Sequence, residues 1–461
     1  MKLFRQLIIL CLIVILLLLF IYPLSAYNYL YTNESGEPVK WDNSKLIQYY
    51  LDPDPLIGFS LDQTHMLLQE AMKLWENVPT ANVPKFEFAG YLPEDVNESN
   101  YSKYLDKFTC YTESLEYCDN RTVHESLQTV IIIDNNGKIL DDYLSPTDPY
   151  CIGFGSLETF EGGILDNIQY VVQGYVVLGR PTIGSASGYV SWMAHELGHL
   201  LGLGHTMIYQ QLFDAGTNIA EPYLYVPTML MNPGSGLSSL NSYGSTLNPD
   251  DIAGVSYLYP SETFDQETAT VKGTIKKADG SPMQKVNIIV RDIEDPLCKV
   301  YSLVSGRFCT HEGQSILLFC DEPNGQYTIS GLPAGDYIVE VEEVEDEDMA
   351  MAVGLFYGYE LAGDAEFWND GDQASEDPYA YTVISLAAGE TRENVDIILN
   401  RSEVTEGRIK FIPLDVLLAN FPLPETTACT DTTIDYAALI GYDEPGTQTP
   451  ATGGCSLIMR K

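Results

Sequence analysis

Three of the six histidines of this 461-residue chain lie within 11 residues, in the segment HELGHLLGLGH that begins at His195. His195 and His199 are four positions apart, so on a helix their imidazoles leave the same face about one turn apart. Two imidazoles at this spacing can bind one Zn²⁺ through nitrogens about 2.0–2.1 Å from the metal. Glu196 lies at the edge of the same face, where its carboxylate could accept a proton from water at the metal. The segment therefore predicts a zinc-binding helix that carries its own general base.

The third histidine reaches such a site only if the chain bends. A straight helix would carry His205 away from the metal, but Gly202 can adopt a conformation that other residues disfavour and so end the helix. His205 can then return as a third ligand. Three neutral nitrogen ligands leave the fourth tetrahedral position open for water, which is the pattern of catalytic zinc. The simpler interpretation, a buried apolar helix with histidines by chance, explains neither the glycine nor the third histidine.

Hydrophobic periodicity predicts the elements that must position this site. Three runs have the composition of strands: 45–51 (KLIQYYL), 129–133 (TVIII) and 168–178 (IQYVVQGYVVL). The sequence SLDQ at 60–63 resembles a capping box, and apolar residues near helical spacing continue from it to Trp75. Strands and helices mixed in this way indicate an α+β domain over residues 39–260.

The histidine segment resembles the HExxHxxGxxH signature of metzincin zinc endopeptidases, and more narrowly it resembles the matrixins. The similarity extends to Trp41, to the helix that ends in AMKLW at Trp75 and to LNPDDIAGVSYLYP over 247–260. The resemblance implies a zincin domain, with a twisted mixed sheet plus helices, over residues 39–260. It also implies that the three histidines hold one catalytic Zn²⁺ and that the glutamate is the general base of peptide-bond hydrolysis.

Metzincins also place a methionine in a turn beneath the metal. Two candidates follow the motif, Met229 in VPTM and Met231 in MNP, and we favour Met229. The acids Asp250 and Asp251 stand in the first turn of a helix that Asn248 would cap, facing its positive end. In matrixins an Asp of this pair supports the active-site helix without reacting, and we expect only that role here. Outside this context the methionine would be core packing and the acids a helix start.

The chain also departs from the matrixin pattern. An insertion over about 206–225 separates the third histidine from the methionines, so we do not expect the substrate preference of matrixins to transfer. About 14 residues, none of them cysteine, lie between Ala26 and Trp41, so a cysteine-switch mechanism of latency is not expected. The resemblance also implies that substrate lies extended along an edge strand, which we expect within 168–178.

A second module follows over residues 268–400. Short strand-like runs alternate there with turn clusters such as ADGS at 278–281 and GLPAGD at 331–336, which indicates an all-β sandwich. These motifs resemble carboxypeptidase-regulatory-like, or transthyretin-like, domains. Because they mainly encode turns, they identify fold better than function. We expect a spacer or stabilising role, in preference to binding of a substrate or surface.

The two ends of the chain have different patterns. Residues 1–26 have the pattern of a signal peptide, because basic residues precede an apolar run from Leu7 to Tyr22 and Ala26 offers a small residue for cleavage. An uncleaved membrane anchor is the alternative. The protein is therefore expected to be exported, either secreted or held at the cell envelope. Residues 401–461 show no clear periodicity and are expected to form a partly flexible tail.

Export makes disulfide bonds available to the eight cysteines that follow the signal segment. They form groups of three, three and two, so either one bridge crosses between the first two groups or each of these keeps a free thiol. The groups are Cys110, Cys118 and Cys151; Cys298, Cys309 and Cys320; and Cys429 and Cys455. The spacing leaves the connectivity open.

Charge excludes one class of partner. Acidic residues outnumber basic ones 65 to 24, which gives a net charge of −41. Such a surface repels phosphate backbones, so nucleic-acid binding is excluded and membrane contact is expected only through the N-terminal segment. The acidic tract from Asp134 to Asp142 could bind Ca²⁺, but its glycine is misplaced for an EF-hand and a plain turn is favoured.

These observations predict an exported zinc-dependent endopeptidase whose partner is a protein or peptide substrate. The alternative is a non-catalytic, zinc-containing surface adhesin or binding protein. The intact Glu196 argues against this alternative, because a purely structural zinc site has no use for a general base.

Overall fold

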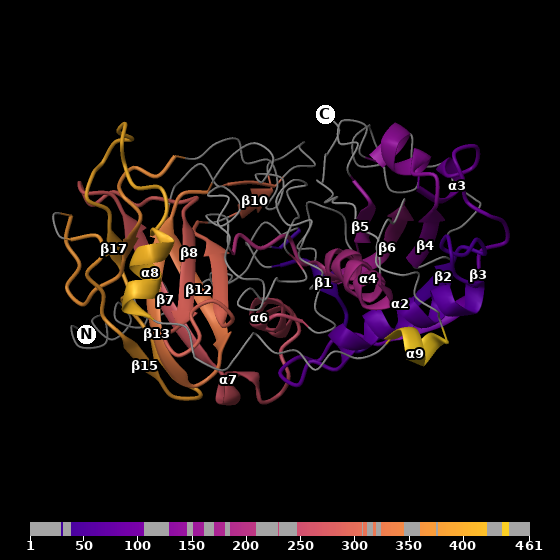
Figure 1. Cartoon of the computed structure of the whole chain (residues 1–461), viewed down its shortest axis with the longest axis horizontal. Coiled ribbons are helices and arrows are strands. Elements are labelled where there is room, and N and C mark those ends of the chain that lie inside the picture. Colours follow the sequence, from indigo (N-terminus) through magenta and orange to yellow (C-terminus); the bar gives the residue numbers. More distant parts are fainter. Residues whose placement is uncertain are drawn as a thin grey trace, which may run out of the picture.

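The computed structural model describes residues 29–30, 38–105, 129–144, 151–160, 170–179, 185–208, 229, 247–306, 308–310, 317–319, 324–344, 360–374, 377–421 and 436–441. Within these ranges the chain mixes helices with several β-sheets, in agreement with the α+β prediction. Figure 1 shows two bodies side by side, one built from the earlier strands and helices and the other from the later strands. The predicted signal segment, 1–26, lies outside the described ranges. No helix within those ranges is long and apolar enough to cross a membrane.

The first body is built on a six-stranded mixed sheet. Its strands are β1 (Lys40–Trp41), β2 (Ile47–Leu51), β3 (Phe86–Tyr91), β4 (Thr129–Asp134), β5 (Gly153–Phe160) and β6 (Tyr170–Gly179). The order is β1-β6-β4-β2-β3, with β5 on β6. The pairings among these strands are parallel except that of β5 with β6, which is antiparallel. The three predicted strand runs are thereby confirmed as β2, β4 and β6.

The described helices include the three that local signals predicted: the one capped by Ser60, the one that carries His195 and the one capped by Asn248. The described helices are α2 (Leu61–Glu76), α3 (Ser102–Leu105), the π-helix η3 (Leu140–Leu144), α4 (Ala186–Leu201), α6 (Pro249–Leu258), α7 (Phe264–Glu267), α8 (Leu414–Asn420) and α9 (Tyr436–Ile440). The predicted capping box at α2 is confirmed, since Ser60 and Gln63 bond to each other's backbone N–H groups. α2 and α4 pack against each other beside the sheet (Figure 1).

The second body contains two larger sheets, the arrangement expected of a β-sandwich. One has the order β12-β7-β16 with β17 also on β7, and the other has β14-β13-β8-β9 with β15 also on β13; β10 and β11 form a separate pair. The strands are β7 (Ala269–Lys276), β8 (Asn287–Asp292), β9 (Val300–Val304), β10 (Phe308–Thr310), β11 (Leu317–Phe319), β12 (Gln326–Leu332), β13 (Gly335–Glu342), β14 (Glu366–Phe367), β15 (Ile384–Leu386), β16 (Thr391–Arg392) and β17 (Ile397–Ile398).

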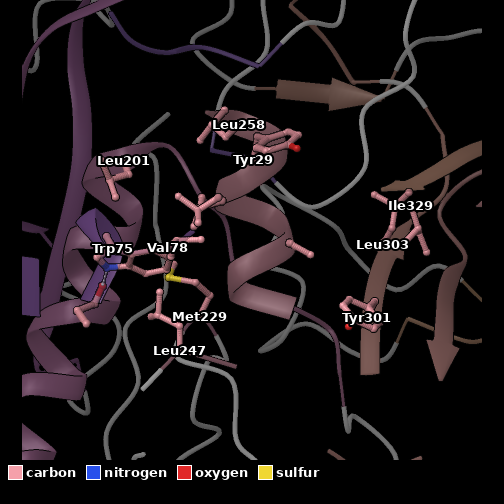
Figure 2. Packing of buried hydrophobic residues seen from close by; sticks show 14 of the residues in the cluster. Tyr29, Trp75, Val78, Leu201, Met229, Leu247, Leu258, Tyr301, Leu303 and Ile329 are labelled. Atoms are coloured by element: carbon pink, nitrogen blue, oxygen red, sulfur yellow. Dashed lines mark hydrogen bonds between the residues drawn. The ribbon is translucent and has the colours of Figure 1, made fainter. Parts of the chain in front are cut away.

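Helix α6 joins the two bodies into one apolar core. Figure 2 shows this helix with Leu201 and Met229 on one side and with Tyr301 and Ile329 on the other. The same continuous cluster contains buried side chains from α2, α4 and both larger sheets of the sandwich. The sandwich over 268–400 is therefore packed directly against the first body, and its expected role as a spacer or stabilising module stays a prediction.

The C-terminal segment contacts both bodies. Phe421, at the end of α8, lies against Tyr381 of the sandwich with ring centroids 4.9 Å apart. Further along, α9 packs on α2 and α4, and the Gln63 side chain donates to the carbonyls of Ile440 and Gly441 at 3.3 Å each. Much of 401–421 and the short α9 are thus folded, which the absence of periodicity did not predict.

The acidic tract after β4 forms a turn. Gly137 N–H donates to Asp134 O at 2.8 Å, and the Asp134 carboxylate accepts from Leu140 N–H at 3.0 Å at the start of η3. These bonds agree with the plain-turn interpretation. Calcium binding by this tract stays a prediction.

Candidate metal centre

Helix α4 carries the first two histidines, and its start is capped. The Ser185 hydroxyl accepts from Gly188 N–H at 3.1 Å, which satisfies one of the free donors at the helix N-terminus. Nearly every side chain of the helix is buried, whereas His195 is partly exposed. The helix is therefore a rigid core element that presents one of the three candidate ligands toward the surface.

The end of α4 is a Schellman motif. Gly202 has φ of 106°, a left-handed conformation, and its N–H donates to His199 O at 2.9 Å. Leu203 N–H donates back to Gly198 O at 3.0 Å, which completes the motif. The chain reverses at this point, as the predicted bend requires, and His205 returns toward the helix.

Two long-range bonds satisfy the remaining carbonyls at the end of α4. Trp41 Nε1–H donates to Leu200 O at 2.7 Å, and the Tyr259 hydroxyl donates to Leu201 O at 2.8 Å. The last four carbonyls of a helix have no partner within it, so a buried helix end needs such donors. These side chains come from β1 and from the end of α6, and they hold the helix end in place.

The three imidazoles converge on one point. The Nε2 atoms of His195 and His199 are 3.2 Å apart, those of His199 and His205 3.0 Å, and those of His195 and His205 3.1 Å. Nitrogens bound at about 2.0–2.1 Å to a tetrahedral ion are separated by about 3.3–3.4 Å. The triangle thus fits one Zn²⁺ after a shift of a few tenths of an ångström. Among the described residues, these three histidines form the cluster of three or more His, Cys, Asp or Glu side chains whose ligand atoms lie close enough together to hold one metal ion.

Hydrogen bonding sets the tautomer of one ligand. His199 Nδ1 lies 2.8 Å from Leu203 O, and because a carbonyl can only accept, Nδ1 carries the proton. Nε2 of His199 therefore presents a lone pair to the centre of the triangle. Burial lowers the pKa of His199 to about 3, and burial also lowers the pKa of His205, with the neighbouring histidines adding to both shifts. Both imidazoles are neutral at pH 7, as metal ligands must be.

Glu196 lies between α4 and strand β5. Its side chain is only 2% exposed, and burial raises the pKa of its carboxyl well above the ordinary value, while a hydrogen bond from Gly155 N–H opposes the shift. Gly153 and Gly155 are essential to this arrangement, since a Cβ at either would overlap atoms of Glu196. Sequence analysis missed these glycines; their alternation in GFGS, on one face of a strand, was the available signal.

The structure corrects the expected position of the edge strand. Strand β6, which occupies most of 168–178, has β4 on one side and β5 on the other and is interior. Among the described strands, β5 pairs only with β6 and forms the edge next to α4. Periodicity revealed the strand at 168–178 but carried no information on its neighbours.

Met229 lies directly beneath the histidine helix. A Cβ at Gly198 would overlap the Met229 sulfur and lie 2.9 Å from Trp75 Cζ2, so these side chains pack tightly against the glycine. Figure 2 shows Met229 next to Trp75. Its backbone O accepts from Thr206 N–H at 3.0 Å. Met231, the other candidate, lies outside the described residues, as does most of the predicted insertion over 206–225.

This packing makes a substitution at Gly198 informative. Glycine to alanine within a helix ordinarily stabilises by about 1 kcal/mol. We expect Gly198→Ala to destabilise the protein by about 1–3 kcal/mol instead, because the new methyl group meets Met229 and Trp75. Unfolding in denaturant measures the change. Adding Met229→Ala to this variant should recover part of the lost free energy of unfolding. If Gly198→Ala alone were as stable as wild type, the tight packing of Met229 and Trp75 on Gly198 would be contradicted.

Asp251 links Met229 to the start of α6. Its carboxylate accepts from Met229 N–H and from Asn248 N–H, each at 2.9 Å. Asn248 caps the helix as predicted, accepting from its second residue. Asp251 therefore ties the backbone at Met229 to the start of α6, while the supporting role expected for one acid of the pair stays a prediction.

Asp250 makes different contacts. Its Oδ1 accepts from the backbone N–H of Ser302 in β9 at 2.8 Å, and the Thr206 side chain also donates to it. Burial raises the pKa of Asp250 to about 8, although both hydrogen bonds oppose that rise. This acid joins the residue after His205 to the sandwich, a role that the sequence did not indicate.

A scan against models of known protein families finds no match for this chain, and a search of curated proteins also finds none. The assignment of chemistry to this centre therefore depends on its own residues.

Proposed function

We propose that this chain is an exported zinc endopeptidase of the metzincin type. Its matrixin-like catalytic module would span 39–260, and a carboxypeptidase-regulatory-like sandwich would span 268–400. Two observations together carry the proposal: the three Nε2 atoms lie 3.0–3.2 Å apart, and the residue after His195 on α4 is a buried glutamate, Glu196. A structural zinc site needs the three histidines but has no need of the buried glutamate.

In the proposed reaction, Zn²⁺ on His195, His199 and His205 would supply a Lewis acid that polarises the scissile carbonyl and acidifies water. Glu196 accepts the proton of the attacking water and delivers it to the nitrogen of the leaving amine. Burial raises the pKa of this carboxyl, which makes its carboxylate a stronger base for that proton. Gly155 N–H holds one side of the carboxylate in place.

Peptide substrate would lie extended along β5. Within the described residues this strand forms the edge of the sheet next to α4, and its Gly153 and Gly155 lie against Glu196. Backbone hydrogen bonds to a free strand edge recognise an extended chain regardless of its side chains. A substrate on this edge would pass beside the general base.

Export is supported by the cysteines as well as by the predicted signal segment. Cys151 and Cys298 are both disulfide-bonded. Disulfides persist in oxidising compartments and are rare in the cytosol. The negative charge of −41 agrees with a protein that does not bind nucleic acid.

Metal removal tests the proposal. We expect residues 27–461, purified with bound zinc, to cleave an unfolded protein, and a strong chelator to abolish that activity. One equivalent of Zn²⁺ should restore it, whereas Mg²⁺ should not, because nitrogen ligands favour zinc. Zinc content is measured in parallel. A preparation that binds zinc tightly but cleaves nothing would support the adhesin alternative, and one that binds no zinc would contradict both.

A further inference from the structure

The segment that follows the third ligand is hydrogen-bonded on both sides. Thr206 N–H donates to Met229 O at 3.0 Å, and the Thr206 side chain donates to Asp250. One residue later, Met207 O accepts from the Asn287 side-chain amide at 3.2 Å. The bond from Asn287 comes directly from the sandwich, and Asp250 leads to the sandwich through the bond that it accepts from Ser302 N–H. The position of His205 therefore depends on residues outside its own module.

Asn287 is oriented by a buried network on one sheet of the sandwich. The residue is 0% exposed, its Oδ1 accepts from the Ser302 hydroxyl at 2.9 Å, and its Nδ2 also donates to Glu342 at 2.8 Å. These residues lie on β8, β9 and β13, which are adjacent strands. A buried amide held on both sides has one favourable orientation, so its bond to Met207 O is directed.

Ser302 connects the two paths. Its hydroxyl orients Asn287, and its backbone N–H donates to Asp250, which in turn accepts from Thr206. Apolar contacts between β9 and α6 accompany these hydrogen bonds. Figure 2 shows Tyr301 and Leu303, the neighbours of Ser302 on β9, facing α6 across the same interface.

We propose that the sandwich is a positioning element of the metal centre, in which Asn287, Ser302 and Asp250 hold the segment that carries His205. The inference rests on the proposed function to the extent that the metal is Zn²⁺. Groups that orient metal ligands from outside the coordination sphere are worth about 10- to 100-fold in metal affinity. A module that only stabilised the fold would change the free energy of unfolding and leave zinc affinity unaltered.

Full-length variants that each remove one polar group provide the test. Thr206→Val removes the hydroxyl that donates to Asp250, Ser302→Ala removes the hydroxyl that orients Asn287, and Asn287→Ala removes the bond to Met207 O. The matched control is Tyr327→Phe, which deletes a buried hydrogen bond to Val395 O within the other sheet of the sandwich. Zinc affinity is measured by competition with a chromophoric chelator, and stability by unfolding of the zinc-free protein.

We expect zinc affinity to fall about tenfold in Thr206→Val and Ser302→Ala and up to about 100-fold in Asn287→Ala, with Tyr327→Phe within about twofold of wild type. Amide exchange over 203–208 in the zinc-free protein should be faster in Ser302→Ala than in Tyr327→Phe. If Asn287→Ala fails to fold, Thr206→Val and Ser302→Ala still show whether the sandwich affects zinc affinity. Zinc affinities that match those of Tyr327→Phe would overturn the inference while leaving the proposed function intact. A wild-type protein without zinc affinity would overturn both.

Discussion

Replacing Glu196 by glutamine is expected to lower the rate of peptide hydrolysis by about 10²- to 10⁴-fold while zinc stays bound. Glutamine has nearly the same shape and can still accept the hydrogen bond from Gly155 N–H, but it cannot accept a proton from water. The fold should be as stable as wild type or more stable, because burial disfavours the charged form of this carboxyl.

Three measurements on Glu196→Gln separate the possible roles of this residue: turnover of an unfolded protein, zinc content and thermal unfolding. Glu87→Gln, an exposed glutamate on the outer strand β3, is the matched control and should behave as wild type. Full activity in Glu196→Gln would exclude the residue as general base. Loss of zinc together with activity would assign it to maintaining the site.

Gly202→Ala is expected to cost about 2–3 kcal/mol of stability and to weaken zinc binding at least tenfold. The left-handed φ of 106° strains any residue with a Cβ, and at this position the Cβ would also lie 3.0 Å from Val39 O. Any shift of the turn moves Leu203, whose carbonyl orients the His199 ring. The same shift moves His205, which follows two residues later.

Gly280 offers a matched control for this substitution. It also has a left-handed φ, of 82°, but a Cβ there would meet nothing within 4 Å. Gly280→Ala should therefore show the backbone strain alone, about 1 kcal/mol, with zinc affinity unchanged. Chelator competition and denaturant unfolding measure both quantities. Equal losses of zinc affinity in the two variants would contradict a specific role for the turn after α4.

Local spacing along the chain was sufficient to predict the histidine helix, its bend and its capped neighbours. In a helix, residues four apart share a face by geometry alone, so His195 and His199 could be placed together without knowledge of the fold. Gly202 and the capping boxes at Ser60 and Asn248 are likewise signals complete within a few residues. These predictions succeeded because their physical cause lies within one turn of backbone.

Long-range contacts decided the rest. Whether a strand is interior or at an edge depends on its neighbours, so the pattern at 168–178 could not reveal that β6 is interior and that β5 forms the edge next to α4. In the same way, Asp250 and Asp251 are adjacent in sequence, but only Asp250 accepts a hydrogen bond from the sandwich, whereas Asp251 accepts from Met229 and Asn248. Only the packing of α6 against the sandwich distinguishes them, because burial and hydrogen-bond partners arise from residues about 50 positions away.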